Sequence, residues 1–162
     1  MKNRIGQGID VHQLVAGTPL IIGGVSIPYS KGSSGHSDGD VLYHAIVDAI
    51  LGALSLGDIG QHFSSDDDKW KDAPSRKFLE HAKYLMQENG YTTFNIDATV
   101  ILQDPKINIY IIEMRKNIAH ILSLDIDAVS VKSTTTDYLG VIGSGEGIAA
   151  TAVALLTGDN ES

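Results

Sequence analysis

Apolar residues cluster most densely between residues 36 and 60, and their spacing predicts a buried helix. Most of the circumference of this helix is apolar, but Asp40, His44 and Asp48 recur every four residues and form a single polar stripe. A polar stripe on a buried helix is costly unless its groups find partners. The stripe is therefore the first candidate for a functional site.

The ends of this predicted helix carry recognisable signals. Ser37 or Asp38 can cap its first turn, because either side chain can accept a hydrogen bond from a free backbone amide. Gly57, with Asp58 and Gly60 behind it, ends the apolar run. The helix should therefore begin just after Ser37 and stop before Gly57.

Alternation and helical spacing predict the other elements. The sequence predicts strands over residues 4–12, 91–102 and 128–133, a hairpin over 19–29 that turns at Gly23 and Gly24, and helices over 75–89, from the turn at 104–106 to 122, and from 143 to 156. Residues 31–35 are predicted to be a flexible loop and the acidic residues 61–74 a surface loop. The GSGEG motif at 143–147 does not match a dinucleotide-binding fingerprint.

A metal site is one of two interpretations of the polar stripe. Asp10 and His12 alternate with apolar neighbours and project from one face of their predicted strand, where oxygen and nitrogen donors suit zinc. His44 can supply a third ligand as a neutral imidazole, with Asp48 or Asp40 orienting its ring. Alternatively, His44 is protonated and forms a structural ion pair between the two stripe carboxylates.

Two further segments carry groups that suit phosphate. Thr134, Thr135, Thr136 and Asp137 follow the predicted strand at 128–133, so they form either a phosphate-and-metal cradle or a threonine-rich strand end. His36 precedes the predicted buried helix, where backbone amides favour an anion, although it can equally be an exposed loop histidine.

Composition narrows the class of protein. A chain of 162 residues with 43% hydrophobic residues fits one domain. Because the sequence has no cysteine, any zinc must be held by nitrogen and oxygen ligands. The absence of cysteine is also compatible with a reducing cytoplasm. The net charge of -8 argues against a nucleic-acid partner. No apolar run approaches a membrane span, and the polar start lacks a signal peptide. We therefore expect a soluble cytoplasmic protein that binds neither nucleic acid nor membrane.

Five segments resemble the 2-C-methyl-D-erythritol 2,4-cyclodiphosphate synthase family of isoprenoid biosynthesis. They are GIDVH (8–12), IIGGVSIPYSKG (21–32), HSDGDVLYHAIVDAILGALSLGDIGQHF (36–63), KSTTTDYLG (132–140) and GEGIAATAVALL (145–156). They stand in the family's order, and the likeness runs from about residue 4 to residue 157. The resemblance implies one α/β (α+β) domain over residues 1–162, with a mixed β-sheet packed by helices plus a β-hairpin. It also implies a homotrimer with a central channel and active sites between subunits.

The resemblance also assigns roles to residues. Asp10, His12 and His44 would bind zinc, Asp137 would lie near a second divalent cation, Mg²⁺ or Mn²⁺, and His36 and Thr135 would stabilise the transition state. The implied substrate contacts are Asp10, Val11, His12, His36 and Ser37; Asp58, Ile59 and Gly60; Phe63, Ser64, Ser65, Asp66 and Asp67; Leu102, Gln103, Asp104, Pro105, Lys106, Ile107 and Asn108; Thr134, Thr135, Thr136 and Asp137; and Val141 and Ser144.

The implied reaction closes a ring within one substrate molecule. The 2-phosphate of 4-diphosphocytidyl-2-C-methyl-D-erythritol 2-phosphate attacks the β-phosphorus of its diphosphate and expels CMP, which requires cations but no general base. One alternative is a zinc-dependent phosphohydrolase in which water attacks. Another is a non-enzymatic trimer that binds anions or metal.

The sequence departs from the family pattern in three places. Relatives commonly carry Glu where Asp137 stands, Pro-Asp-Thr-Asp where residues 64–67 stand, and Phe and Arg where Val141 and Ser144 stand. The last departure weakens the case for an isoprenoid diphosphate bound in the channel.

Overall fold

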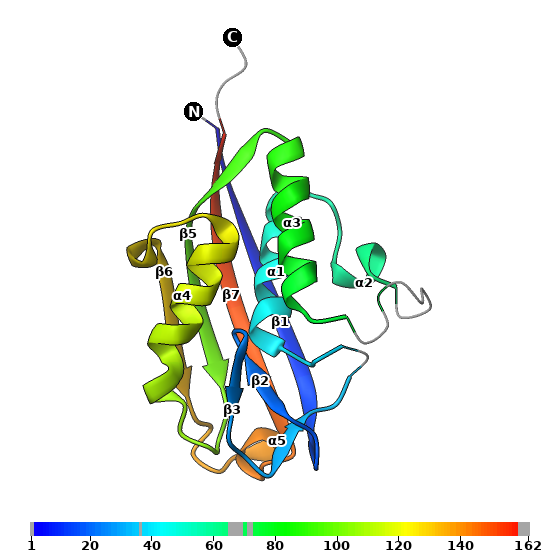
Figure 1. Ribbon diagram of the computed structural model, residues 1–162, viewed down its shortest axis with the longest axis vertical. Helices are drawn as coiled ribbons and strands as arrows, with labels where there is room; N and C mark the ends of the chain where they lie inside the picture. The colour runs from blue at the N-terminus through cyan, green and yellow to red at the C-terminus, as the bar shows by residue number, and fades with distance from the viewer. Residues whose placement is uncertain (1, 36, 65–69, 71–72, 159–162) are drawn as a thin grey trace.

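The computed structural model describes residues 2–35, 37–64, 70 and 73–158. Within these residues, five strands form one sheet in the order β4-β1-β7-β5-β6, and two short strands form a separate hairpin (Figure 1). The strands are β1 (Lys2–Ala16), β2 (Leu20–Ile22), β3 (Val25–Ile27), β4 (Lys31–Ser33), β5 (Tyr91–Ile101), β6 (Val129–Thr134) and β7 (Gly147–Gly158). Because β5 pairs parallel with β6 and antiparallel with β7, the sheet is mixed, as expected.

The long helices α1 (Val41–Ala53), α3 (Arg76–Glu88) and α4 (Ile111–Leu122) lie on one face of this sheet (Figure 1). The short helices are α2 (Ile59–His62) and α5 (Gly140–Gly143), and 3-10 turns form at Asn108–Tyr110 and Ile126–Ala128. The helix α1 packs on β1 and β7, and α3 packs on α1. On the opposite face of β1, Ile5, Ile9 and Val11 are 57–71% exposed. No helix in the described part of the chain is long and apolar enough to cross a membrane.

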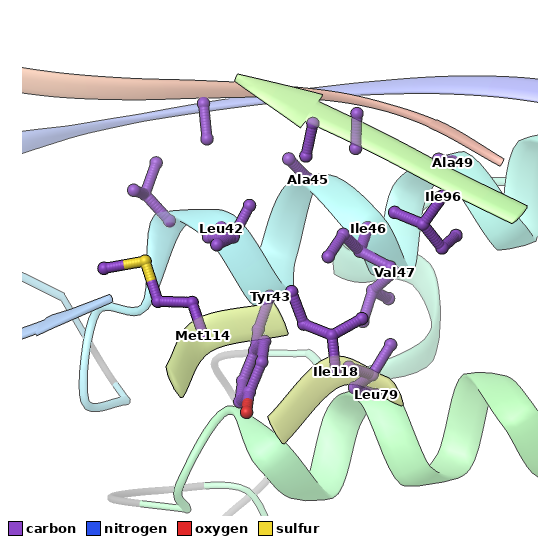
Figure 2. Close-up of a cluster of buried hydrophobic side chains, with 14 of the residues drawn as sticks. Leu42, Tyr43, Ala45, Ile46, Val47, Ala49, Leu79, Ile96, Met114 and Ile118 are labelled. Atoms are coloured by element: carbon purple, nitrogen blue, oxygen red, sulfur yellow. The ribbon is translucent and has the colours of Figure 1, made fainter. Parts of the chain in front are cut away.

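The core is built around α1, as the apolar pattern of the sequence predicted. Eleven of its 13 residues are buried. Figure 2 shows Ile46 and Val47 of α1 in one cluster with Ile96 of β5 and Ile118 of α4. This helix therefore holds the sheet and the outer helices together, and its position fixes the position of every side chain it carries.

Two glycines allow α1 to lie directly on β1. A Cβ atom added at Gly8 would lie 2.0 Å from the carbonyl oxygen of Ala45, and one at Gly6 would lie 1.9 Å from that of Ala49. Such contacts are far shorter than atoms tolerate, so only glycine permits this approach. The closeness brings the buried face of α1 down onto the residues of β1 that point toward it.

The segment from Gly147 to Gly158 is the strand β7, so the prediction of a final helix from residue 143 was wrong. This strand lies between β1 and β5, and its residues are apolar on both faces, so they show no period-2 alternation. Its α1-facing positions include Ala150, Ala152 and Ala154, all almost completely buried. Alanine is a strong helix former, but here tertiary packing under α1 decides the structure.

Smaller differences concern the ends of elements. Asp40 is the N-cap of α1 and accepts a hydrogen bond from Tyr43 N at 3.1 Å, so neither Ser37 nor Asp38 caps the helix. Residues 31–33, predicted as loop, form β4 and pair with the end of β1. The predicted loop at 61–74 begins within the short helix α2. The hairpin, α3, β5, α4 and β6 lie where the pattern placed them, within a few residues.

Candidate functional site

Asp10, His12 and His44 converge between β1 and α1. One ligand atom from each residue lies within 4.8 Å of the other two. Asp10 Oδ2 is 2.7 Å from His12 Nε2 and 3.1 Å from His44 Nδ1. The structure thus brings together the three residues that the sequence singled out for a metal. We call them the triad.

Local geometry explains why the triad forms. Asp10 and His12 follow Gly8 on the same face of β1, since alternate residues of a strand point the same way. His44 lies on the face of α1 that Gly8 allows to approach β1, and its side chain is only 10% exposed. The triad therefore depends on a close contact between backbone atoms as well as on the three side chains.

Electrostatics in the triad favour an ion pair when no metal is bound. Burial alone would raise the pKa of Asp10, but hydrogen bonds from His12 and His44 outweigh burial and hold this pKa well below its usual range. The hydrogen bond to Asp10 raises the pKa of His12 above its ordinary value. The other ring nitrogen of His12, Nδ1, donates to the carbonyl oxygen of Ser34 at 2.8 Å.

The triad fits a divalent metal. One carboxylate oxygen and two imidazole nitrogens are donors that zinc and similar ions accept, and three protein ligands leave a position for substrate. Ligands of a tetrahedral zinc lie about 3.3 Å from one another, given bonds of about 2.0–2.2 Å. The two separations from Asp10 Oδ2, 2.7 and 3.1 Å, are close to this value, and all three ligand atoms lie within 4.8 Å of one another.

Asp40 does not orient His44, contrary to one part of the sequence prediction. It is fully buried and accepts hydrogen bonds from Gly23 N at 2.9 Å, Gly24 N at 2.7 Å and Tyr43 N at 3.1 Å. Burial raises the pKa of Asp40 to about 6, although these backbone donors act in the opposite direction. Asp40 therefore fastens the β2–β3 turn to the start of α1.

Asp48 does not orient His44 either. Its Oδ1 accepts a hydrogen bond from Ile59 N at 2.7 Å, and burial raises its pKa. Asp48 follows His44 by one helical turn on the same face of α1, so this bond holds residues 58–60 near the triad. Asp58, Ile59 and Gly60 were assigned to substrate binding, and their place beside α1 is consistent with that assignment.

The partners of His44 are Asp10 on one side and Ser75 on the other. His44 Nε2 lies 2.8 Å from Ser75 Oγ, which also contacts a carboxylate oxygen of Asp38. The sequence pattern indicated Ser75 only as the start of a helix and Asp38 only as a possible helix cap. Ser75 is 31 residues from His44, so no local pattern could have revealed the contact.

Other predicted substrate contacts also lie near the triad. Ser37 Oγ is 3.4 Å from His44 Nε2. Phe63 is buried against the rings of Trp70 and Phe78, and Ser64 follows it at the surface. The remaining predicted residues of this group, His36 and Ser65 to Asp67, lie outside the described residues.

A second cluster of predicted residues lines a pocket of about 190 Å³ at the ends of β5 and β6. Its lining residues are Leu102, Pro105, Lys106, Ile107, Asn108, Ser133, Thr134 and Thr135. Gln103, which is not a lining residue, accepts a hydrogen bond from Tyr138 N at 3.0 Å and so joins the two loops. The structure therefore unites the predicted substrate contacts at residues 102–108 with the threonines predicted to hold phosphate. Ser133 is an addition that the sequence analysis missed.

Six other predicted residues are not among those that line the pocket. Asp137 is exposed, and its backbone N–H donates to Thr135 Oγ1 at 3.3 Å. The side chain of Thr136 donates to the carbonyl oxygen of Leu139. Val141, which is 63% exposed, and Ser144 lie in and after α5. Asp104 is exposed beside the pocket, and Val11 points to the bare face of β1.

The triad and the pocket lie on different strands of the same sheet. One row of paired residues runs from Asp10 through Ala150 and Val100 to Ser133. Neighbouring strands are about 4.8 Å apart, so this row puts roughly 14 Å between the triad strand and the pocket strand. Within one chain, the two groups of residues therefore form separate parts of a site.

Sequence comparison decides the family. The sequence pattern of the YgbB family matches residues 3–157, nearly the whole chain. The chain belongs to the YgbB family. A relative from Geobacillus kaustophilus, named 2-C-methyl-D-erythritol 2,4-cyclodiphosphate synthase, is 58% identical over 153 residues, which are 94% of this chain and 97% of that protein. The protein of the same name from Bacillus subtilis is 56% identical over the same shares.

Solved structures agree with this YgbB assignment. IspF of Plasmodium falciparum in a CDP complex is 40% identical, with a TM-score of 0.86 over 98% of this chain and 97% of that one. The bifunctional IspDF of Campylobacter jejuni is 42% identical with a TM-score of 0.93; the match covers 98% of this chain and 43% of that longer one. The resemblance found in the sequence is confirmed, and the phosphohydrolase alternative finds no support among these relatives.

Proposed function

We propose that the chain converts 4-diphosphocytidyl-2-C-methyl-D-erythritol 2-phosphate to 2-C-methyl-D-erythritol 2,4-cyclodiphosphate and CMP. The observation that carries the proposal is the convergence of Asp10, His12 and His44 in a chain whose 53–58% identical relatives are named for this product. In the reaction, an oxygen of the 2-phosphate forms a bond to the β-phosphorus, and the bond from that phosphorus to the CMP oxygen breaks.

The site needs to bring anions together rather than remove a proton. The attacking phosphate oxygen is already ionised, so the barrier comes from repulsion and from the freedom of a flexible substrate. A divalent metal held by the triad would neutralise and polarise the attacked phosphate. The hydroxyls of Thr134 and Thr135 donate to phosphate oxygens, and we assign transition-state stabilisation to Thr135 and His36.

The substrate would extend from the pocket to the triad. Backbone groups of the turn at residues 102–108 suit cytosine, and a 40% identical relative forms a complex with CDP, which supports a cytidine nucleotide in this pocket. Residues 58–60, together with Phe63 and the segment at 64–67, would hold the methylerythritol portion. Ser37, beside His44, would bind its 2-phosphate.

We assign zinc to the triad and a magnesium or manganese ion to a place near Asp137. Two imidazoles and a carboxylate without cysteine suit zinc. Hydroxyl and carboxylate oxygens at Thr135 and Asp137 suit a harder ion that is held mainly by the substrate diphosphate. Such cations also explain how a chain with a net charge of -8 handles a polyanion.

We infer that three copies assemble into a homotrimer with a central channel. Two observations support this assembly. Ile5, Ile9 and Val11 leave an apolar stripe exposed on the bare face of the sheet, and such a stripe is typical of an interface. The triad and the pocket lie roughly 14 Å apart across one sheet, so a neighbouring subunit's pocket can complete the site. Native mass spectrometry should give three times 17.3 kDa, and Val11→Asp should give monomers.

The reaction itself is tested with the cytidyl substrate. Equimolar CMP and cyclodiphosphate would support the synthase. A linear phosphate product would support a hydrolase, and binding without turnover would support a non-enzymatic role. We expect the enzyme to act in the cytoplasm without nucleic acid or membrane as partner, on the basis of its composition alone.

The metal assignment has its own test. His44→Ala should lose stoichiometric zinc and activity while its circular dichroism stays that of the wild type. Zinc retained at full occupancy in this variant would contradict the assignment of His44 as a ligand, whatever the activity.

A further inference from the structure

Ser75 and Asp38 form a hydrogen-bonded chain behind the triad. Ser75 Oγ lies 2.8 Å from His44 Nε2 and donates to Asp38 Oδ1, while Ser75 N donates to Asp38 Oδ2 at 3.1 Å. Ser75 is fully buried, so water cannot replace these contacts. The carboxylate of Asp38 therefore accepts two hydrogen bonds from Ser75 and fixes the direction of its hydroxyl group.

The number of hydrogens in this chain determines the state of the His44 ring. A serine hydroxyl has one hydrogen, and an ionised carboxylate can only accept. The hydroxyl hydrogen of Ser75 therefore goes to Asp38, and Ser75 Oγ offers His44 only a lone pair. Ser75 Oγ, at 2.8 Å, is closer to His44 Nε2 than Ser37 Oγ, at 3.4 Å, so Nε2 carries a hydrogen and donates it to Ser75. Nδ1, the atom 3.1 Å from Asp10, is then the nitrogen for a metal.

The Ser75 hydroxyl does not cap its own helix, and besides His44 and Asp38 it contacts Ser37 Oγ at 3.3 Å. Ser75 occupies the N-cap position of α3, where a serine side chain normally accepts a hydrogen bond from the first turn, yet it makes no such bond. By contrast, Asp40 and Asp58 at the N-caps of α1 and α2 both do so. The Ser75 hydroxyl is thus directed to His44 in place of its own helix.

We propose that Ser75, held by Asp38, is a positioning residue that fixes the ring orientation and tautomer of His44 for metal binding. The inference rests on the proposed metal site. For His12, the corresponding partner is the carbonyl oxygen of Ser34, which accepts a hydrogen bond from His12 Nδ1 at 2.8 Å. Both imidazoles would therefore enter the metal site with their outer nitrogens already engaged. Groups that orient metal-binding histidines in this way typically change metal affinity 10- to 100-fold when removed.

The test compares two buried serines. Ser75→Ala removes the hydroxyl that faces His44. Ser33→Ala removes a hydroxyl that is 2% exposed and has no hydrogen-bond partner among the described residues. Zinc affinity of each metal-free protein would be measured by competition with a chelator, and the visible spectrum of the Co²⁺ form would report the ligand geometry. Nitrogen-15 NMR of the zinc-bound histidine rings would show which nitrogen of His44 carries the hydrogen.

Ser75→Ala should bind zinc 10- to 100-fold more weakly, with an altered Co²⁺ spectrum and a His44 Nε2–H signal broadened by exchange with water. Ser33→Ala should match the wild type in all three measurements. If Ser75→Ala does not fold, Asp38→Asn serves as the test variant. It weakens the hydrogen bonds that Asp38 accepts from Ser75, so it should also lower zinc affinity.

The possible failures are distinguishable. The positioning role would be overturned, and the metal site left intact, if Ser75→Ala bound zinc within twofold of the wild-type affinity. If Ser75→Ala does not fold, the same criterion applies to Asp38→Asn. If the wild type and Ser33→Ala themselves bind no stoichiometric metal, the proposed metal site fails, and the positioning role fails with it.

Discussion

Replacing Gly8 by alanine should damage the metal site without altering any of its ligands. The added Cβ would lie 2.0 Å from the carbonyl oxygen of Ala45 and 2.7 Å from the backbone N of Ala49. Atoms in folded proteins do not approach so closely, so α1 and β1 must separate by about 1 Å at this point. His44 lies on α1 and Asp10 on β1, so the separation acts directly between two triad residues.

The magnitude follows from the displacement. Overpacking of this kind costs roughly 1–3 kcal/mol, and the upper part of that range applies because the clash is with backbone atoms that cannot rotate away. Metal sites tolerate deviations of about 0.2 Å in ligand distance, so a shift of about 1 Å should lower zinc affinity at least tenfold.

Urea unfolding and chelator competition would measure the two effects, at one fixed subunit concentration because assembly contributes to stability. Gly52→Ala is the matched control, since a Cβ there meets only Gln7 O at 3.8 Å. Gly52 lies inside α1, so this control should gain about 0.5–1 kcal/mol from helix propensity and leave zinc affinity unchanged. Wild-type stability together with wild-type affinity in Gly8→Ala would refute the reasoning.

Three further predictions concern the triad, the pocket and the core. In the metal-free protein, the lowered pKa of Asp10 makes its ion pair with His12 stabilising above about pH 3.9, and the raised pKa of His12 makes the pair stabilising below about pH 6.5, with the stabilisation progressively lost at higher pH. The urea midpoint should therefore be highest between these two pH values, and His12→Asn should flatten the pH profile. A wild-type midpoint that keeps rising to pH 8 would contradict the predicted direction of the pH dependence. Thr135→Ala should reduce turnover roughly 10- to 100-fold, the value of a hydrogen bond to a charged group, with unchanged zinc content; unchanged turnover would remove Thr135 from the reaction. Ser33→Ala should raise the free energy of unfolding by about 1 kcal/mol, because it removes a buried hydroxyl that has no partner in the described part of the chain. Destabilisation in urea would show that the hydroxyl is satisfied.

The sequence was sufficient for most elements because their apolar periods match their burial. The triad was also accessible, since Asp10 and His12 share a strand face and His44 interrupts a buried helix face. The helix predicted from residue 143 failed because β7 lies in the interior of the sheet beneath α1. At that position both faces of the strand are apolar, and the tight contact with α1 leaves room only for small residues such as alanine. The composition of β7 therefore resembles that of a helix.

Contacts made by the start of α3 could not be predicted. The partnership of His44 with Ser75 spans 31 residues and depends on where the segment before α3 meets α1. The pocket could be assembled only through the resemblance, because its two loops follow strands whose parallel pairing the pattern of residues does not specify. Local periodicity thus identifies elements, whereas the contacts that complete a site arise from the ends of elements far apart in the chain.

The polar stripe of α1 explains why these distant segments meet. Each stripe residue fastens a different part of the chain: Asp40 holds the β2–β3 turn, His44 contacts β1 and the start of α3, and Asp48 holds the amide of Ile59. The sequence pattern predicted that the three residues form one polar stripe centred on His44. The structure instead distributes them over three successive turns of one rigid helix, so a displacement of α1 must alter all three attachments together. Zinc affinity and the order of residues 58–60 should therefore change in parallel in Gly8→Ala, whereas Asp48→Asn should disturb residues 58–60 alone.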